Sequence, residues 1–300
     1  GQNNYQSAQQ SNTDKRPQTL HHVRLPIKNV SKPMILTTQL SRALLCTSLL
    51  LITNAWSSFA NAAEELAYEI IAERTHKPVL FTQGLLVDGD HFYETSGLYN
   101  QSLLVTYPIA EPASTWAKIS APFTKKQAIP NQYFAEGLAL LDNKLYVLTW
   151  MEKTLLVYDK ATLSYEKSMS YNGEGWGLTT DGKSLIRSDG SATIYFHQPK
   201  DFSITKTLTV KDGDKEINQL NELEYANGVL WANIWHDDRI LKIDPKTGKV
   251  LAQLNLSALK SKVKLDNSEQ VLNGIAWDPN QKAFWITGKQ WPKMFLVKIP

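Results

Sequence analysis

Cysteine is almost absent from this chain. Of its 300 residues only Cys46 is a cysteine, and it lies in an apolar stretch near the N-terminus. Without that stretch the chain has neither a disulfide nor a thiol nucleophile. An exported protein that lacks disulfides must be held by its core alone, which fits a bacterial periplasm.

Several motifs of enzyme chemistry are also missing. The chain has no Gly-X-Ser-X-Gly, no Walker loop and no dinucleotide fingerprint. The histidines His76, His91, His197 and His236 share no spacing that would predict a metal triad. Long amphipathic helical patterns are absent, and only 256–263 is expected to form a helical turn or two. These absences argue against the common serine hydrolases and nucleotide-dependent enzymes.

No apolar run is long enough to cross a bilayer as a helix. The run 43–52 is too short, follows Arg42, and precedes the small residues 60–62 at a cleavage spacing. This pattern is typical of a secretory signal peptide that starts at Met34. We therefore expect three parts: 1–33, an upstream or vector-derived disordered segment; 34–62, the signal peptide; and 63–300, the folded domain. The protein is expected to be exported to the bacterial periplasm or secreted.

The basic charge of the full chain resides in its leader. Removing 1–62 leaves 26 Lys and Arg against 28 Asp and Glu. The remaining 238 residues suffice for one domain with a large core. With a small negative charge, nothing in that domain predicts binding to nucleic acid or to an anionic membrane.

Five copies of a short pattern recur through the rest of the chain. Their key residues lie 53, 40, 45 and 52 residues apart, and each copy precedes a turn signal and a strand-like run. A period of about 40–50 residues with hairpin signals is typical of a β-propeller. We therefore predict an all-β fold, a five-bladed β-propeller with four-stranded antiparallel blades. The copies are Phe81–Leu85, Phe134–Leu138, Glu174–Leu178, Gln219–Leu223 and Val271–Ile275.

The strand at the N-terminal end of the domain has no partner in this repeat pattern. Residues 68–73 alternate like a strand, and the last blade, ending at 294–299, needs one more strand. We expect the two to pair, which would close the ring and remove an exposed sheet edge.

Pseudo-symmetry predicts that two sets of residues meet at one mouth of the central channel. The first set precedes the Gly-Leu step of each copy: Gln83, Glu136, Trp176, Asn221 and Asn273. The second set follows fourteen residues later, or sixteen in the fifth repeat: Gly97, Trp150, Gly190, Trp235 and Lys289. One strand out and one strand back bring both sets to the same end of a blade.

Packing alone explains some of these markers, but Glu136 is hard to explain that way. Trp231, Trp277 and Trp285 are expected to be core residues, and Phe81 and Phe134 could also serve packing. Glu136 stands where the other repeats have neutral residues. A carboxylate in an apolar mouth tends to have a raised pKa, which suits acid–base chemistry.

At these residues the sequence resembles the plant- and bacterial-type glutaminyl-peptide cyclotransferases, a family of five-bladed propellers. The resemblance runs from about 68 to 299. The family's pocket residues fall on Phe81, Gln83, Phe134, Glu136, Trp150, Trp176, Asn221, Trp235 and Lys289, each of the matching type. The motifs that carry it are Phe81–Leu85, Phe92–Tyr99, Phe134–Leu138, Gly175–Leu178, Leu220–Tyr225, Asn233–Trp235 and Leu272–Trp277.

The resemblance implies an aminoacyltransferase that converts an N-terminal glutamine to pyroglutamate and releases ammonia. It implies Glu136, Asn221 and Lys289 as the catalytic residues, with no metal and no cofactor. Phe81, Gln83, Phe134, Trp150, Trp176 and Trp235 are the implied substrate-binding residues. The expected partners are peptides or proteins with N-terminal glutamine, and the protein is expected to be a monomer without membrane contact after signal cleavage.

The implied mechanism uses the substrate's own α-amine as nucleophile. Glu136 would accept a proton from the amine and then deliver one to the leaving NH2. Lys289 and Asn221 would donate hydrogen bonds to a carbonyl oxygen, and Gln83 would orient the peptide amide.

Two other classes of protein fit parts of the pattern. A non-catalytic propeller could use the same aromatic mouth to bind a peptide or a protein. A calcium-dependent, lactonase-like hydrolase would need several acidic or amide ligands on the channel axis, and Glu136 is the only acid among the gathered positions.

Overall fold

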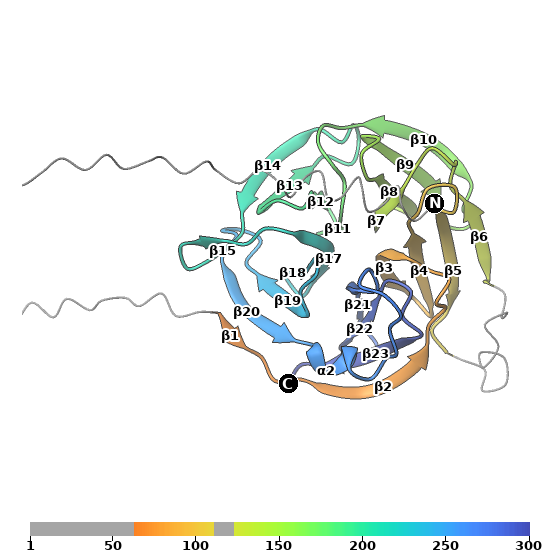
Figure 1. Ribbon diagram of the computed structural model, residues 1–300. Coiled ribbons are helices and arrows are strands. Elements are labelled where there is room, and N and C mark those ends of the chain that lie inside the picture. The colour runs from red at the N-terminus through yellow and green to blue at the C-terminus, as the bar shows by residue number, and fades with distance from the viewer. Residues whose placement is uncertain (1–62, 111–122) are drawn as a thin grey trace, which may run out of the picture. The chain divides into compact units, whose positions relative to one another are not determined.

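The computed structural model describes residues 63–110 and 123–300. The predicted upstream segment 1–33 and the predicted signal peptide 34–62, with Cys46, lie outside the described residues. Within them, five sheets form a ring, each with four antiparallel strands that run from near the centre to the rim (Figure 1); one sheet has a short fifth strand at its outer edge. The predicted five-bladed propeller is confirmed.

Each blade follows the predicted repeat along the chain. Blade I contains β3 (Thr82–Asp88), β4 (His91–Ser96), β5 (Leu103–Pro108) and β6 (Lys125–Ala128). Blade II contains β7 (Ala135–Leu141), β8 (Lys144–Thr149), β9 (Thr154–Asp159) and β10 (Tyr165–Ser170). Blade III contains β11 (Leu178–Thr180), β12 (Leu185–Arg187), β13 (Thr193–His197) and β14 (Ile204–Thr209). Blade IV contains β17 (Leu220–Ala226), β18 (Val229–Ile234), β19 (Arg239–Ile243) and β20 (Val250–Asn255).

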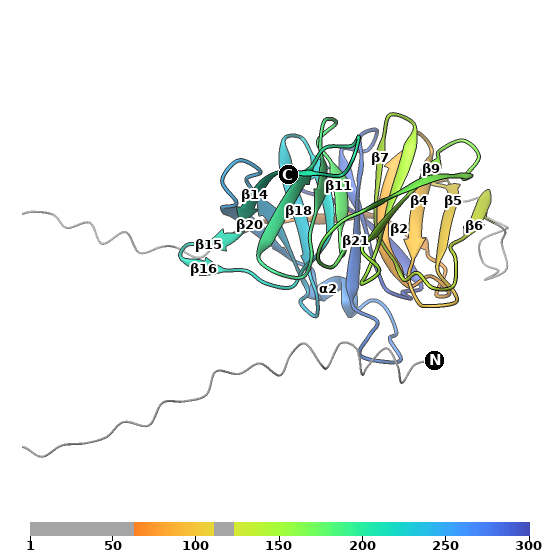
Figure 2. The same cartoon turned by 90° about the horizontal axis from the view of Figure 1, so that it is seen from above.

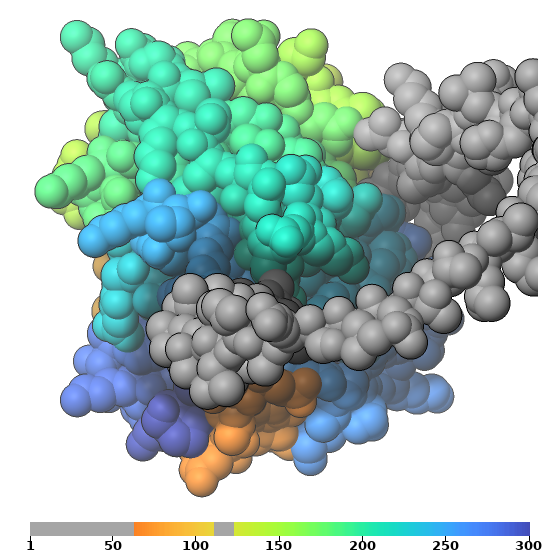
Figure 3. Space-filling model, turned by 90° about the vertical axis from the view of Figure 1, so that its left-hand side faces the viewer, coloured from red at the N-terminus to blue at the C-terminus, as the bar shows by residue number. Residues whose placement is uncertain are grey.

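Blade V is built from both ends of the described chain. Its strands are β21 (Leu272–Asp278), β22 (Ala283–Gly288), β23 (Lys293–Lys298) and β2 (Glu69–Thr75). β2 pairs antiparallel with β23, from Glu69 opposite Lys298 to Thr75 opposite Lys293. The predicted ring closure is therefore confirmed, and orange N-terminal residues lie against blue C-terminal ones in the space-filling view (Figure 3).

Four short elements in the described part of the chain lie outside the repeat. β1 (Glu64–Glu65) adds parallel to the outer strand of blade IV, and α2 (Ser257–Lys260) is the predicted helical turn. The hairpin of β15 (Lys211–Asp212) and β16 (Lys215–Glu216) projects from the ring between blades III and IV (Figure 2).

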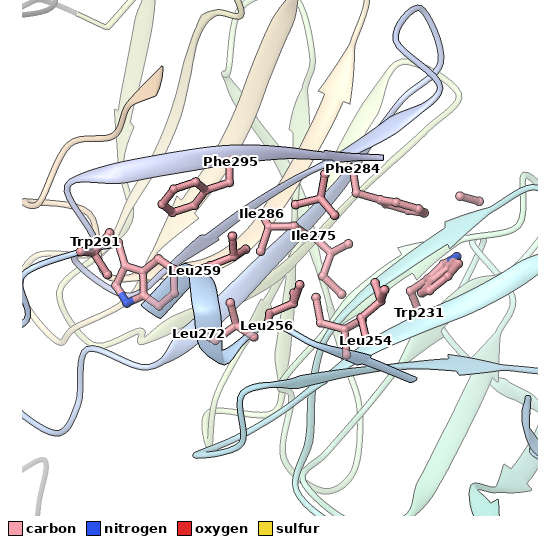
Figure 4. Close-up of a cluster of buried hydrophobic side chains, with 14 residues drawn as sticks. Trp231, Leu254, Leu256, Leu259, Leu272, Ile275, Phe284, Ile286, Trp291 and Phe295 are labelled. Atoms are coloured by element: carbon pink, nitrogen blue, oxygen red, sulfur yellow. The ribbon is translucent and has the colours of Figure 1, made fainter. Parts of the chain in front are cut away.

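The core is divided among the five junctions between blades. One buried cluster lies at each junction, because the inner strands are covered on both faces by their neighbours. At the junction of blades IV and V, Trp231 and Leu254 face Phe284, Ile286 and Phe295 (Figure 4). The expected core residues Trp231 and Trp285 are buried, and Trp277 packs partly buried against Phe284.

Hydrogen bonds near the channel link each blade to the next. They run from Thr95 Oγ1 to Glu136 O (2.6 Å), from Gly137 N to Trp176 O (2.7 Å), from Ser188 Oγ to Asn221 O (2.6 Å), from Gly274 N to Asn233 Oδ1 (3.0 Å) and from Asn273 Nδ2 to Thr82 O (2.9 Å). Four of the five inner strands also contain a register shift at this level. Such bulges turn a strand locally and re-aim its side chains. Here they fall on the variable residues of the repeat.

Candidate active site

Backbone hydrogen bonds bring the two predicted sets of residues to the same end of each blade. In four blades the amide of the second-set residue donates to the carbonyl two residues before the first-set residue. The pairs are Gly97 with Phe81 (2.9 Å), Trp150 with Phe134 (3.0 Å), Trp235 with Gln219 (2.8 Å) and Lys289 with Val271 (2.9 Å). The last pair spans two more residues than the others, as the longer hairpin predicted. In blade III the Gly190 amide instead donates to the Leu220 carbonyl of blade IV.

Glu136 is buried and is held by a chain of amide side chains. Gln83 Nε2 donates to Glu136 Oε1 at 3.1 Å. Asn273 Nδ2 donates to Gln83 Oε1 at 3.4 Å and to the Thr82 carbonyl at 2.9 Å. Three first-set residues from blades I, II and V therefore form one connected group, in which the carboxyl has a fixed orientation.

Burial and neighbouring charges act together on the pKa of Glu136. Burial raises it well above its ordinary value, the Lys289 ammonium opposes the rise, and Glu152 and Glu174 add to it. Burial also lowers the pKa of Lys289, against the effect of Glu136 and Glu269. A carboxyl and an amine whose pKa values are shifted towards each other are suited to exchange protons with a bound substrate.

Aromatic rings line the mouth in two groups. In the first group Phe134 lies edge-on to Phe81 at 6.4 Å and to Trp150 at 5.6 Å, and Lys289 Nζ lies 4.8 Å above the Phe81 ring. In the second group Trp176 and Trp235 are perpendicular, with centroids 5.8 Å apart. The walls are thus apolar and rigid, and would shield a small substrate from water.

Four buried polar atoms at these positions have no hydrogen-bond partner within the described residues. They are Asn221 Oδ1, Trp235 Nε1, Asn273 Oδ1 and Gln219 Oε1. A buried polar group without a partner is costly, and a ligand that supplied partners would remove that cost. Donor and acceptor atoms both occur among the four, so the ligand should carry both kinds of group, as a primary amide does.

Three carboxylates near the mouth were missed by the sequence analysis, which found Glu136 alone. Glu174 accepts hydrogen bonds from two indoles, and Glu152 accepts the Tyr99 hydroxyl at 2.6 Å. Glu269 lies near Lys289 and 4.0 Å from His236. Glu152 and Glu269 lie between strands, where the repeat gives no signal. Glu174 occupies the repeat position of Phe81 and Phe134, so a comparison of that column could have found it.

The predicted residues thus all lie at one end of the ring, but not in one contact group. One contact group is linked by the bonds and ring contacts above and by the charge interaction of Lys289 with Glu136. It contains Gln83, Glu136, Phe81, Phe134, Trp150 and Lys289. Trp176 and Trp235 form the second group, which Glu174 joins to the first through Trp150. Asn221 stands at the junction of blades III and IV, where its carbonyl accepts the Ser188 hydroxyl.

The described residues contain neither a metal-binding cluster nor a membrane-spanning helix. No three His, Cys, Asp or Glu side chains in the described part gather closely enough to hold a metal ion. None of its helices is long and apolar enough to cross a membrane.

Comparisons with known proteins agree on one family. The family model described as glutamine cyclotransferase matches residues 43–299. A curated relative, glutaminyl-peptide cyclotransferase from Arabidopsis thaliana, is 37% identical over 256 residues, which is 82% of this chain and 77% of the relative. The crystal structure of Myxococcus xanthus glutaminyl cyclase superposes with a TM-score of 0.72 at 38% identity, covering 79% of this chain and 98% of that one.

Proposed function

The chain belongs to the glutamine cyclotransferase family, and from that premise we propose that it is a glutaminyl-peptide cyclotransferase. It would convert the N-terminal glutamine of peptides and proteins to pyroglutamate. The substrate's α-amine attacks its own side-chain γ-carbonyl, the new C–N bond closes a five-membered lactam, and the bond to the amide nitrogen breaks. The nitrogen leaves as ammonia, so the enzyme need supply only geometry and protons.

The observation that carries the proposal is the buried carboxyl of Glu136 among amides and a lysine. Glu136 would accept a proton from the attacking amine and return it to the leaving nitrogen, so its ionised form begins the reaction. Its burial favours this double role, because a pKa above the ordinary carboxyl value brings it closer to that of the amine. Gln83, which donates a hydrogen bond to the Glu136 carboxyl, would also orient the peptide amide of the substrate.

Lys289 and Asn221 would hold the oxygens of the substrate. Lys289 can donate to the γ-oxygen as negative charge develops on it. Asn221 offers the unpartnered acceptor Oδ1 as well as its amide N–H groups, so it can bind either end of the glutamine amide. The rings of Phe81, Phe134, Trp150, Trp176 and Trp235 would press the side chain into its folded conformation, which raises the effective molarity of the amine.

The setting of the enzyme is part of the proposal. The N-terminal pattern supports a signal peptide and export to the periplasm or beyond, since it has the charge, apolar run and cleavage spacing of such a segment. The near-neutral charge of the domain supports a substrate that is neither nucleic acid nor membrane. The chemistry as drawn requires no metal, and the protein would act as a monomer.

The test is ammonia release from a short peptide with N-terminal glutamine, in the presence of EDTA. Glu136→Gln should lower kcat roughly a hundredfold to ten-thousandfold, the usual contribution of a general acid–base group. Glu166→Gln, on the outer strand β10 with Lys144 as its partner, is the matched control and should keep full activity. A peptide with an acetylated N-terminus should release nothing.

Other outcomes point elsewhere. Near-normal turnover by Glu136→Gln would refute its acid–base role, and loss of wild-type activity on adding EDTA would refute the metal-free chemistry. A folded wild type that binds the peptide without releasing ammonia would identify a peptide-binding propeller instead.

A further inference from the structure

Among the described residues, Glu174 is the carboxylate at the mouth that contacts both aromatic groups. Its Oε2 accepts the indole N–H of Trp150 at 2.9 Å and that of Trp176 at 2.9 Å. Trp150 follows the second strand of blade II, whereas Trp176 precedes the first strand of blade III. One oxygen atom therefore joins the two aromatic groups described above.

The backbone around Glu174 is itself held firmly. The buried guanidinium of Arg187 donates to the Glu174 carbonyl, and the Gly175 amide donates to the Trp150 carbonyl at 2.9 Å. Arg187 lies between the rings of Tyr171 and Tyr195, at 5.1 and 4.2 Å from their centroids. With its main chain fixed on both sides, the carboxylate has little freedom to leave the indoles.

The indole of Trp176 has two further close neighbours. Gly190 lies against this ring so closely that a Cβ on Gly190 would be 2.6 Å from it. Beyond it, Trp235 packs perpendicular to Trp176. The Glu174 carboxylate is thus the polar edge of an otherwise apolar wall, and its loss would free two indoles together.

Packing alone does not explain a charge at this position. Blades I and II carry Phe81 and Phe134 there, so the fold accommodates an apolar ring. A half-buried carboxylate costs more to desolvate than a phenyl ring. Besides burial, three charged groups affect the pKa of Glu136: Lys289 lowers it, and Glu152 and Glu174 raise it. Burial raises the pKa values of the Tyr99 and Tyr171 hydroxyls, and the charge of Glu136 in turn adds to this rise.

We propose that Glu174 is a positioning residue of this pocket, which locks the Trp150 and Trp176 indoles into one wall against the substrate glutamine. As a separate effect, its negative charge adds to the rise of the pKa of Glu136. The inference rests on the proposed function, because the wall needs a substrate to position. Glu174, which precedes the first strand of blade III, would thus serve the reaction without touching a reacting atom, unlike Glu136.

Two substitutions separate the hydrogen bonds from the charge. Glu174→Gln keeps an oxygen that can accept both indoles but loses the charge. We expect its KM and its tryptophan emission to stay near those of wild type, while the acid limb of kcat moves to lower pH. The sign follows because removal of a negative neighbour lowers the pKa of Glu136, so its ionised form persists to lower pH.

Glu174→Ala loses both the hydrogen bonds and the charge. The same shift of the acid limb is expected, with KM raised roughly tenfold to a hundredfold as the wall loosens. Its tryptophan emission should change, and ultraviolet resonance Raman should show two indole N–H groups that have lost a strong acceptor. Glu152→Gln removes a second charge that raises the pKa of Glu136 without touching an indole, so it should move the acid limb but leave the tryptophan signals unchanged.

Several results would overturn the inference. If Glu174→Ala has the KM and the indole signals of wild type, Glu174 does not position the two indoles. If the acid limb of Glu174→Gln does not move, the charge of Glu174 has no effect on Glu136. Lower thermal stability in both variants with unchanged KM and pH profile would leave a structural role only. If folded wild type releases no ammonia, the proposed function fails. In that case the indole signals alone test the role of Glu174, and equal signals in Glu174→Gln and Glu174→Ala would contradict it.

Discussion

Lys289 is the cation that opposes the rise of the Glu136 pKa caused by burial. Burial lowers the pKa of Lys289 and raises that of Glu136, and each charge counteracts the shift of the other. The pair is thus tuned by its depth in the ring and by its neighbours, and a change in either partner should appear in the pH dependence of turnover.

Replacing Lys289 with methionine should shift the acid limb of kcat to higher pH. Without the ammonium the pKa of Glu136 rises further, so the ionised base forms only at higher pH. This shift is opposite to that expected for Glu174→Gln. The measurement is kcat against pH, with Lys298→Met at the exposed end of β23 as control. A shift to lower pH would contradict the assignment.

Position in the repeat predicted which side chains gather at one end of the ring, and the resemblance to a known family implied their roles. Gln83 and Glu136 occupy one column of the repeat, and Lys289 occupies the other. The unpartnered Oδ1 of Asn221 depends on how one amide is turned, which the sequence does not encode locally. Glu174 was missed because the prediction used the column of Gln83 and Glu136, two residues later, and not the column in which Glu174 replaces Phe81 and Phe134.

At the scale of elements, the inner strands carry glycines where the backbones of adjacent blades nearly touch. Gly177 precedes β11, and a Cβ there would lie 2.0 Å from the Asn221 carbonyl oxygen of blade IV. In the sequence, Gly177 was recognised only as part of the Gly-Leu pair that marks each repeat. The contact explains it, because an added side chain would push Asn221 away from the mouth.

Gly177→Ala should therefore impair both stability and substrate binding. Forcing a methyl group against a neighbouring backbone is expected to lower the free energy of unfolding by about 1–3 kcal/mol and to raise KM. Gly89→Ala is the control, because no atom lies within 4 Å of its Cβ and its φ is +61°. That variant should lose about 1 kcal/mol to backbone strain alone and keep its KM. Equal KM values in the two variants would argue against the contact.

At the scale of the whole molecule, the fold was predictable because its signals repeat. Turn signals recur once per blade, and in blades II and IV both turn residues, Asp142-Asn143 and Asn227-Gly228, adopt positive φ. Ring closure followed from an alternating strand left without a partner. The parallel addition of β1 and the projecting hairpin of β15 and β16 could not be predicted, because each occurs once and depends on a neighbouring surface.

Removal of β2 should destabilise the ring more than removal of β1. A chain starting at Lys77 would expose the edge of β23 and lose Ile70 and Ala72, which pack on two junction clusters. A chain starting at Glu69 keeps β2 and loses the two-residue strand β1 together with Leu66 and Tyr68, which pack on one cluster. Urea unfolding should show a lower midpoint and more aggregation for the shorter chain. Equal midpoints would mean that closure contributes little.

The same closure has a consequence for the order in which the molecule can be assembled. β2 is synthesised before every other strand of the five blades, yet its partner β23 comes last, so that Glu73 and Lys293 are 220 residues apart in the chain. The strands of blades I to IV find their partners within the same blade, but β2 must wait for β23 before blade V is complete. Contacts so distant in sequence slow folding, since a long loop must be ordered before they form. Because Lys289 lies between β22 and β23, the mouth that it completes needs the last strands of the chain, and we expect it to form late in folding.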